Sequence, residues 1–152
     1  IMENMYKMPN ECIELSGEKC SFLETRIEKA CKLAEVNEKF YLATNAMWSY
    51  RLNFMPAIKI SVIWSGIEAL FMIDHNIKNT IATVSSRFIY GNDDKIEDIK
   101  NLYKEARCKA THEYQNGTYD LYKKSNELLY KLILKCIDEG HTPDVNYILT
   151  IF

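Results

Sequence analysis

The spacing of apolar residues along the chain predicts helices. Apolar side chains recur every three or four residues, which is the period of one face of an α-helix, in about five stretches. No segment alternates apolar and polar residues for long enough to indicate a half-buried strand. The joints between the stretches are short, so successive helices are forced to pack side by side. We therefore expect an all-α, antiparallel bundle of about five helices.

The first predicted helix is long and opens with a capping-box pattern, since Ser21 is followed three residues later by Glu24. Its apolar stripe begins on one set of residues and then shifts sideways to another. The first set is Leu23, Ile27, Ala30 and Ala34, and the second is Leu33, Val36, Phe40, Ala43, Met47 and Tyr50. We interpret the shift as the lateral drift of a helix that follows a left-handed bundle. Residues 1–17 show no sustained period and are expected to be an arm or connector before one domain, 18–152.

The most apolar stretch, Pro56 to Ile73, is predicted to be the central helix of the bundle. Pro56 suits a first helical turn, where its missing N–H is not needed. Nearly every face of the following residues is apolar, which indicates burial on several sides. The stretch is about as long as a membrane span, but Lys59 and Glu68 within it, and the amphipathic helices around it, favour a bundle core.

One polar stripe, Ser61, Ser65 and Glu68, runs along this central helix. A strip at the bundle surface would explain it, because glutamate is rarely buried without a partner. Alternatively, Glu68 meets an arginine, either Arg87 or Arg107, and holds it in place. The sequence leaves both interpretations open.

The next helix is predicted from the stripe Ile77, Ile81, Val84 and Phe88, and Gly91 is expected to end it. Asn92-Asp93-Asp94 is then expected to cap a helix that runs from Ile96 to about Tyr114, with Glu97 as the box partner of Asp94.

A last long helix is predicted between Thr118 as its cap and Gly140 as its stop, and Pro143 is expected to start a short terminal helix. The residues expected to face inward on the long helix are Leu121, Tyr122, Leu128, Leu129, Leu132, Ile133, Cys136 and Ile137.

Composition narrows the functional classes. At 152 residues the chain has the length of one domain that can bury a core without disulfides or metal. Its net charge of -2 gives no general basic excess, so any RNA site must be a local patch. The five cysteines are odd in number and form no C-x-x-C pair, which favours reduced thiols and a cytoplasmic protein. The three histidines make no zinc spacing with them, so no metal or cofactor is expected.

The most distinctive chemistry lies near the end of the 96–114 helix, in R-C-K-A-T-H-E-Y. Arg107 and His112 are five residues apart, so they diverge by about 140° in an unbroken helix. They converge on one ligand if the helix unwinds near Thr111, or across the two-fold axis of a homodimer. Such a pair suits phosphodiester chemistry without metal, with histidine moving a proton and arginine stabilising the charge on phosphorus. An arginine and a histidine at this spacing are also common as structural or idle surface residues.

Two segments together resemble the HEPN superfamily, in particular its Apea-like branch. They are W-S-G-I-E-A-L-F, Trp64 to Phe71, and L-Y-K-E-A-R-C-K-A-T-H-E-Y, Leu102 to Tyr114. That branch has a tryptophan-led helix with an aliphatic-Glu-Ala-Leu core, a helix like Ile77 to Ile89, and then a helix with R-x-x-x-x-H. The order and spacing agree over roughly residues 40 to 139.

The resemblance implies a helical bundle that dimerises through the motif helix and, in active members, a metal-independent endoribonuclease. Arg107 and His112 match the catalytic pair. Arg107 would stabilise the phosphorane, and His112 would handle the proton while the 2′-OH attacks and leaves a cyclic phosphate end. Glu68, Tyr103 and Cys108 are the expected supporting residues.

Tyr114 extends the motif to R-x-x-x-x-H-x-Y, the pattern of HEPN toxins paired with a minimal nucleotidyltransferase antitoxin. In those proteins the tyrosine is adenylylated, which would fill the site with negative charge. The leading hypothesis is thus a toxin or antiviral effector that cuts RNA as a cytoplasmic homodimer, with no membrane partner.

Two residues depart from the motif. Cys108 stands where active members usually have a polar residue, and Glu113 stands where the Apea-like branch often has glycine. An acidic group beside the site would repel phosphate, and it would also raise the basicity of the histidine. A second hypothesis is therefore a catalytically silent HEPN-like module that dimerises, or binds nucleotide or RNA, for a larger protein with a sensor domain. A third is a plain helical interaction domain.

Overall fold

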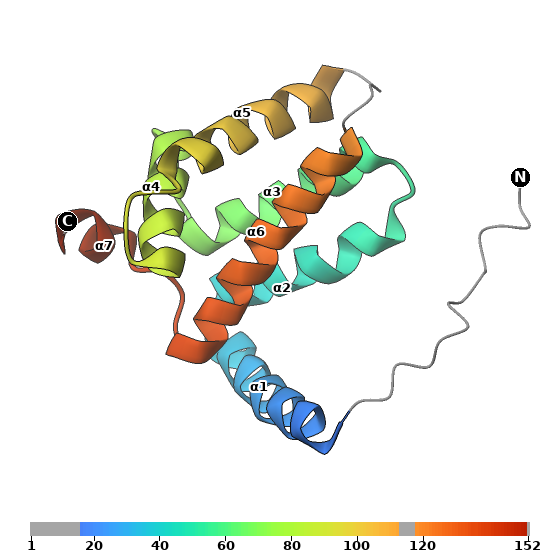
Figure 1. The fold of residues 1–152 in the computed structure, drawn as a ribbon, viewed down its shortest axis with the longest axis vertical. Coiled ribbons are helices and arrows are strands. Elements are labelled where there is room, and N and C mark those ends of the chain that lie inside the picture. Colours follow the sequence, from blue (N-terminus) through green and yellow to red (C-terminus); the bar gives the residue numbers. More distant parts are fainter. Residues whose placement is uncertain (1–15, 113–117, 152) are drawn as a thin grey trace, which may run out of the picture.

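The computed structural model describes residues 16–112 and 118–151, and all regular elements in these ranges are helical. This confirms the all-α class. The described residues form seven α-helices and one 3₁₀ turn, rather than about five helices. They are α1 Gly17–Val36, α2 Glu38–Ser49, η1 Tyr50–Leu52, α3 Pro56–Phe71, α4 Ile77–Tyr90, α5 Ile96–His112, α6 Thr118–Glu139 and α7 Val145–Ile151 (Figure 1).

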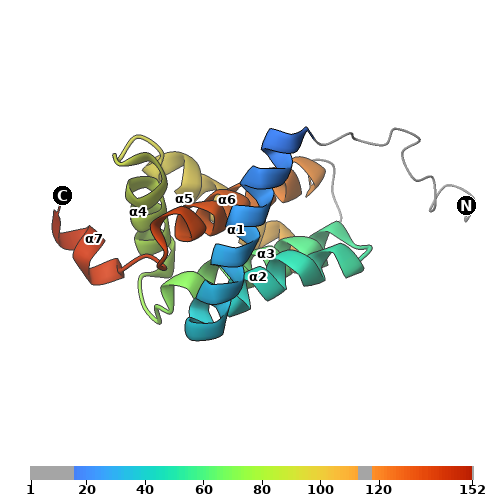
Figure 2. The same cartoon turned by 90° about the horizontal axis from the view of Figure 1, so that it is seen from below.

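The predicted long first helix is two helices that meet at Asn37, and they lie at a clear angle to each other (Figure 2). Asn37 has an extended backbone (φ −130°, ψ 100°), and its side-chain oxygen accepts a hydrogen bond from the Phe40 N–H over 3.0 Å. This is an N-cap, so the sideways shift of the apolar stripe marks the start of a second helix. The interpretation of the shift as superhelical drift was wrong.

The capping box predicted at Ser21 was also wrong. α1 begins at Gly17, and Ser21 lies in its second turn, where its backbone carbonyl accepts a hydrogen bond from the Thr25 hydroxyl over 3.0 Å. The helix therefore extends about one turn further toward the N-terminus than the Ser21 pattern indicated.

α3 is the central helix, as predicted, and it contacts α2, α4, α5 and α6 (Figure 1). Pro56 occupies its first turn. Its buried residues lie within an arc of about 160° around the helix axis, so one broad face is buried. They are Ile60, Ile63, Trp64, Gly66, Ile67, Leu70 and Phe71. Burial of each large apolar side chain contributes about 1.5–3 kcal/mol, so α3 is a main source of stability. No helix in the described ranges is long and apolar enough to cross a membrane.

α2 and α3 approach each other closely at Gly66. A Cβ atom at this position would lie only 2.6 Å from the Cβ of Ala46. Glycine is therefore required here by the distance between the two helices and not by an unusual backbone angle.

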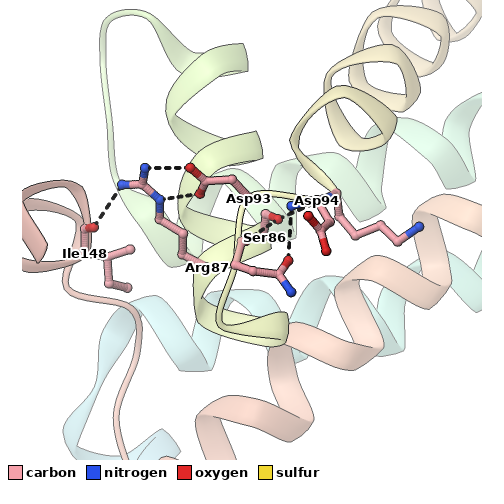
Figure 3. Close-up of polar contacts among 7 residues, drawn as sticks. Ser86, Arg87, Asp93, Asp94 and Ile148 are labelled. Carbon is pink, nitrogen blue, oxygen red and sulfur yellow. Dashed lines mark hydrogen bonds and ion pairs between the residues drawn. The ribbon is translucent and has the colours of Figure 1, made fainter. Parts of the chain in front are cut away.

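The turn between α4 and α5 is held by Arg87 (Figure 3). Its Nε and Nη2 donate to the two carboxylate oxygens of Asp93 over 2.6 and 3.0 Å, and its Nη1 donates to the Ile148 carbonyl over 3.3 Å. The bidentate bond fixes the turn, and the third bond joins it to α7. Gly91 ends α4 with φ +72°, as predicted.

The start of α5 differs from the predicted capping box. Lys95, not Asp94, holds the cap position, because its carbonyl accepts from the Ile99 N–H over 3.0 Å. The Lys95 N–H donates to the Ser86 hydroxyl over 3.2 Å, and that hydroxyl donates to the Asn92 carbonyl over 2.7 Å. A serine of the preceding helix thus accepts from the N–H of the cap residue, the role that the sequence assigned to Glu97 as box partner.

α6 begins at Thr118 and ends before Gly140, which has φ +77°, as predicted. Seven of the eight residues expected to face inward are buried, and Tyr122 is partly buried. The terminal helix α7 starts at Val145, two residues after Pro143, because Asp144 accepts a hydrogen bond from the Tyr147 N–H over 3.0 Å and so caps it.

Candidate functional site

Glu68 on α3 and Arg107 on α5 form an ion pair, with Arg107 Nη2 2.5 Å from Glu68 Oε1. The sequence left Arg87 and Arg107 open as partners, and Arg87 instead binds Asp93. The side chains of Arg107 and Glu68 are 45% and 25% exposed, so the pair lies at the edge of the core and faces solvent. Both interpretations of the polar stripe therefore hold, because it reaches the surface at exposed Ser65 and carries the arginine partner at Glu68.

Tyr103, one turn before Arg107, completes the cluster. Its hydroxyl lies 3.4 Å from Glu68 Oε1, at the long end of hydrogen bonding, and its ring centroid lies 5.8 Å from the Arg107 Cζ. The ring also packs edge-on against Trp64, with centroids 5.0 Å apart at 87°. Trp64 in turn donates its indole N–H to the Ser125 hydroxyl over 3.0 Å. The cluster is thus anchored in the core through α3, α5 and α6.

Arg107 keeps its positive charge in this setting. Partial burial lowers its pKa, but the hydrogen bond with Tyr103 and the negative charge of Glu68 outweigh burial and raise the pKa above its ordinary value. A guanidinium carries five N–H donors in a planar fork, so contact with one carboxylate is compatible with further contact to a phosphate oxygen. The cluster can therefore present a fixed, charged donor to an anion.

α5 is helical through His112, so the unwinding considered near Thr111 does not occur. In a continuous helix, positions 107 and 112 lie about 140° apart around the axis. The two positions therefore do not share one face of α5 within a single chain, and their convergence across a two-fold axis stays a prediction. The side chains of Cys108 and His112, and all of Glu113 and Tyr114, lie outside the described residues.

The described residues contain no group of three or more histidine, cysteine, aspartate or glutamate side chains that could hold a metal ion. Cys136 is buried, and burial raises the pKa of its thiol to about 12. It is therefore a packing residue and not a nucleophile.

A role for Ser125 was not predicted from the sequence. It is fully buried on α6, four residues after Leu121 and four before Leu129, and so continues the apolar face. A serine in that register indicates a buried hydrogen-bond partner, because buried hydroxyls are almost always paired. The partner is the indole N–H of Trp64, the residue that leads the W-S-G-I-E-A-L-F segment.

Comparisons of the chain with protein families, with curated proteins and with solved structures find no match. A charged arginine on α5, held by a carboxylate and a tyrosine and about half exposed, is suited to binding a phosphate or another anion.

Proposed function

We propose that this chain is a metal-independent endoribonuclease of the HEPN type, which works as a homodimer and cuts RNA as a toxin or antiviral effector. The ion pair between Glu68 and Arg107 carries the proposal. It joins the two segments on which the HEPN resemblance rests, and the Trp64–Tyr103 contact joins them a second time. The two segments thus meet at the arginine of the motif, which supports treating them as parts of one site.

In the proposed reaction, His112 accepts the proton of a ribose 2′-OH, and the 2′-oxygen attacks the adjacent phosphorus. Arg107 donates to the oxygens that gain negative charge on phosphorus. The bond to the 5′-oxygen breaks, a protonated histidine returns a proton to that oxygen, and the products carry a 2′,3′-cyclic phosphate and a 5′-OH. Each step uses only side chains and the substrate, so no metal takes part.

The dimer is proposed because α5 is continuous. A pair separated by about 140° on one helix is brought to one phosphate most simply by two copies of α5 facing each other. Tyr114 is proposed as the residue that a nucleotidyltransferase antitoxin adenylylates, since the added phosphate would place negative charge where the RNA phosphate binds.

The second candidate function is a catalytically silent module that dimerises or binds nucleotide or RNA within a larger protein. The ion pair between Glu68 and Arg107 also supports this second function, because an arginine already bonded to a carboxylate of its own chain has a structural role. The two candidates differ in whether RNA is cut.

Purified protein incubated with RNA in EDTA tests the choice. We expect cleavage that His112→Ala and Arg107→Ala each abolish, while His75→Ala, at a histidine that is 91% exposed between α3 and α4, has no effect. Circular dichroism checks that the variants fold. Cleavage that is unchanged in His112→Ala removes this residue from the mechanism, and a folded wild-type dimer that cuts no RNA supports the silent module.

Mixing the two inactive variants tests the dimer. If each site takes its arginine from one chain and its histidine from the other, an Arg107→Ala chain and a His112→Ala chain together form one intact site. Recovered cleavage in the mixture supports the shared site, and no recovery from a mixed dimer refutes it.

A further inference from the structure

Aromatic and basic side chains from η1 and its flanks and from the start of α6 lie together on one surface. The Cζ of Arg51 is 5.2 Å from the ring centroid of Trp48 and 5.9 Å from that of Tyr50. Tyr50 packs on Tyr122 of α6 with centroids 5.8 Å apart, and Tyr122 packs on Tyr119 with centroids 5.9 Å apart. Four rings and a guanidinium thus form a continuous series of contacts across two parts of the chain.

Two lysines extend the series. Lys59 Nζ lies 5.4 Å from the ring centroid of Tyr122, and Lys123 Nζ lies 4.5 Å from that of Tyr119. We call this set the ring–cation surface. It consists of Trp48, Tyr50, Arg51, Lys59, Tyr119, Tyr122 and Lys123.

The ring–cation surface has a buried base and exposed outer rings. Tyr50 is buried, and burial, together with a hydrogen bond to Tyr50, raises the pKa of Tyr122. The outer rings, in contrast, are 69% exposed at Trp48 and 60% exposed at Tyr119. Aromatic rings this exposed contribute little to the core, yet both contact the rest of the series, Tyr119 through the ring of Tyr122 and Trp48 through the guanidinium of Arg51.

Charge is concentrated in the same place. The ring–cation surface holds three basic side chains, Arg51, Lys59 and Lys123, and no acidic one, whereas the whole chain has a net charge of -2. A local basic patch of this kind, interleaved with aromatic rings, is what an otherwise acidic protein needs in order to bind a polyanion. Lysine and arginine contact phosphates, and exposed rings offer faces on which bases stack.

The ring–cation surface also lies near the end of α5. Only residues 113–117 separate His112 from Thr118, so the Cα atoms of these two residues are at most about 23 Å apart, from about 3.8 Å for each Cα step. The end of α5, the start of α6 and the start of α3 lie in the same part of the molecule (Figure 1).

We propose that the ring–cation surface binds single-stranded RNA, with unpaired bases stacked on Trp48 and Tyr119 and phosphates beside the neighbouring cations. A duplex is a poor ligand for it, because its bases are already stacked on each other and their faces are covered. Binding by this surface is independent of catalysis. That the bound strand is the one cut at Arg107 and His112 rests on the proposed function.

The test is the fluorescence anisotropy of a labelled 2′-O-methyl oligouridine, which has no free 2′-OH and so cannot be cut. We expect Trp48→Ala and Tyr119→Ala each to weaken binding by roughly tenfold or more, the loss of one stacked base. Trp48→Phe keeps a ring and is expected to lose less. The matched control is Tyr147→Ala, at a tyrosine of α7 that is 64% exposed and outside the surface, and it is expected to bind as wild type.

Salt dependence tests the cations. Replacing Arg51 or Lys123 with glutamine is expected to reduce the slope of log Kd against log salt by about 0.7 for each charge removed, whereas Lys78→Gln, at an exposed lysine of α4, leaves the slope unchanged. An oligouridine hybridised to its complement is expected to bind more weakly than the single strand.

Three results would overturn the proposal: unchanged binding by Trp48→Ala and Tyr119→Ala, an equal loss in Tyr147→Ala, or binding to phosphatidylserine vesicles through Trp48 without binding to the oligonucleotide. Binding that depends on Trp48 and Tyr119, in a protein that cuts no RNA in EDTA, supports the surface and refutes the nuclease. Cleavage that depends on His112, with oligouridine binding unchanged by either ring variant, supports the nuclease and refutes the ring–cation surface.

Discussion

Glu68 and Arg107 are 39 positions apart in the sequence, yet one carboxylate oxygen of the first lies 2.5 Å from a guanidinium nitrogen of the second. Tyr103 approaches the same oxygen, so one carboxylate orients two side chains of α5. On the proposed function, Glu68 is a positioning residue for Arg107.

Glu68→Gln is predicted to lower kcat for RNA cleavage by about tenfold to a hundredfold with little change in KM, because a small displacement of a catalytic group is costly. The pair is partly exposed, so stability is expected to change by less than about 1 kcal/mol. Steady-state kinetics and thermal unfolding measure the two effects. Glu68→Asp, which keeps the charge, should recover part of the rate, and a kcat equal to wild type in Glu68→Gln would show that Arg107 needs no positioning.

Trp64→Phe is predicted to destabilise the fold by about 1–3 kcal/mol, because it leaves the buried Ser125 hydroxyl without its indole partner. Urea denaturation measures the free energy of unfolding. The control is Trp48→Phe, the same substitution at an exposed ring, which should stay within about 0.5 kcal/mol of wild type. Equal effects at the two positions would contradict the burial and the hydrogen bond described for Trp64.

Gly66→Ala is predicted to cost about 1–3 kcal/mol, because the new methyl group would lie 2.6 Å from the Cβ of Ala46 and force α2 away from α3. Gly17→Ala is the matched control, since no atom lies within 4 Å of a Cβ there. Adding Ala46→Gly to Gly66→Ala should recover part of the loss, and additive losses in the double variant would show that the two residues do not touch.

Asn37 joins two hydrogen bonds that substitutions can separate. Asn37→Ala removes the cap of α2 and the donor to the Thr142 hydroxyl, and it is predicted to cost about 0.5–2 kcal/mol. Asn37→Asp keeps the acceptor for the Phe40 N–H and loses only the donor, so it should cost less. If the two variants unfold at the same urea concentration, the cap is not the stabilising bond.

The ion pair of Asp93 with Arg87 makes the stability of the fold depend on pH. Its hydrogen bond with Arg87 holds the pKa of Asp93 below its ordinary value near 3.8. A lowered carboxylate pKa stabilises the fold above the unfolded-state value, and this stability is lost as pH falls through the lowered pKa. The difference in thermal stability between wild type and Asp93→Asn should therefore be constant near neutral pH and shrink below about pH 4. A difference that persists at lower pH would assign the effect to packing of the turn.

Glycine and proline predicted the helix ends where they occur, whereas the capping boxes expected at Ser21 and Asp94 were wrong. Gly91 and Gly140 both take positive φ, which glycine adopts without steric cost, and Pro56 occupies a first turn. The break at Asn37 carries weaker signals, an asparagine that suits an N-cap and the sideways shift of the apolar stripe, and no glycine or proline interrupts the helical spacing around it. The Thr142 side chain that bonds Asn37 lies 105 positions later, which a local pattern cannot reveal.

The candidate site was predictable only in part. A glutamate on an otherwise apolar helix needs a partner, and this requirement follows from the sequence. The choice of Arg107 over Arg87 does not, because it depends on the turn in which Asp93 binds Arg87 through two hydrogen bonds. The ring–cation surface was not predicted, since Tyr50 and Tyr122 are brought together only by the packing of the folded chain.

The two tryptophans of the chain have opposite surroundings, with Trp64 at 0% exposure and Trp48 at 69%. A water-soluble quencher such as iodide therefore reaches the indole of Trp48 and not that of Trp64. The fluorescence of Trp48, which iodide quenches, should change when a ligand covers the ring–cation surface. The fluorescence of Trp64, which iodide does not reach, should change when the core unfolds. The unlabelled protein thus contains two separate optical signals, one for binding and one for unfolding, and a single titration can record both.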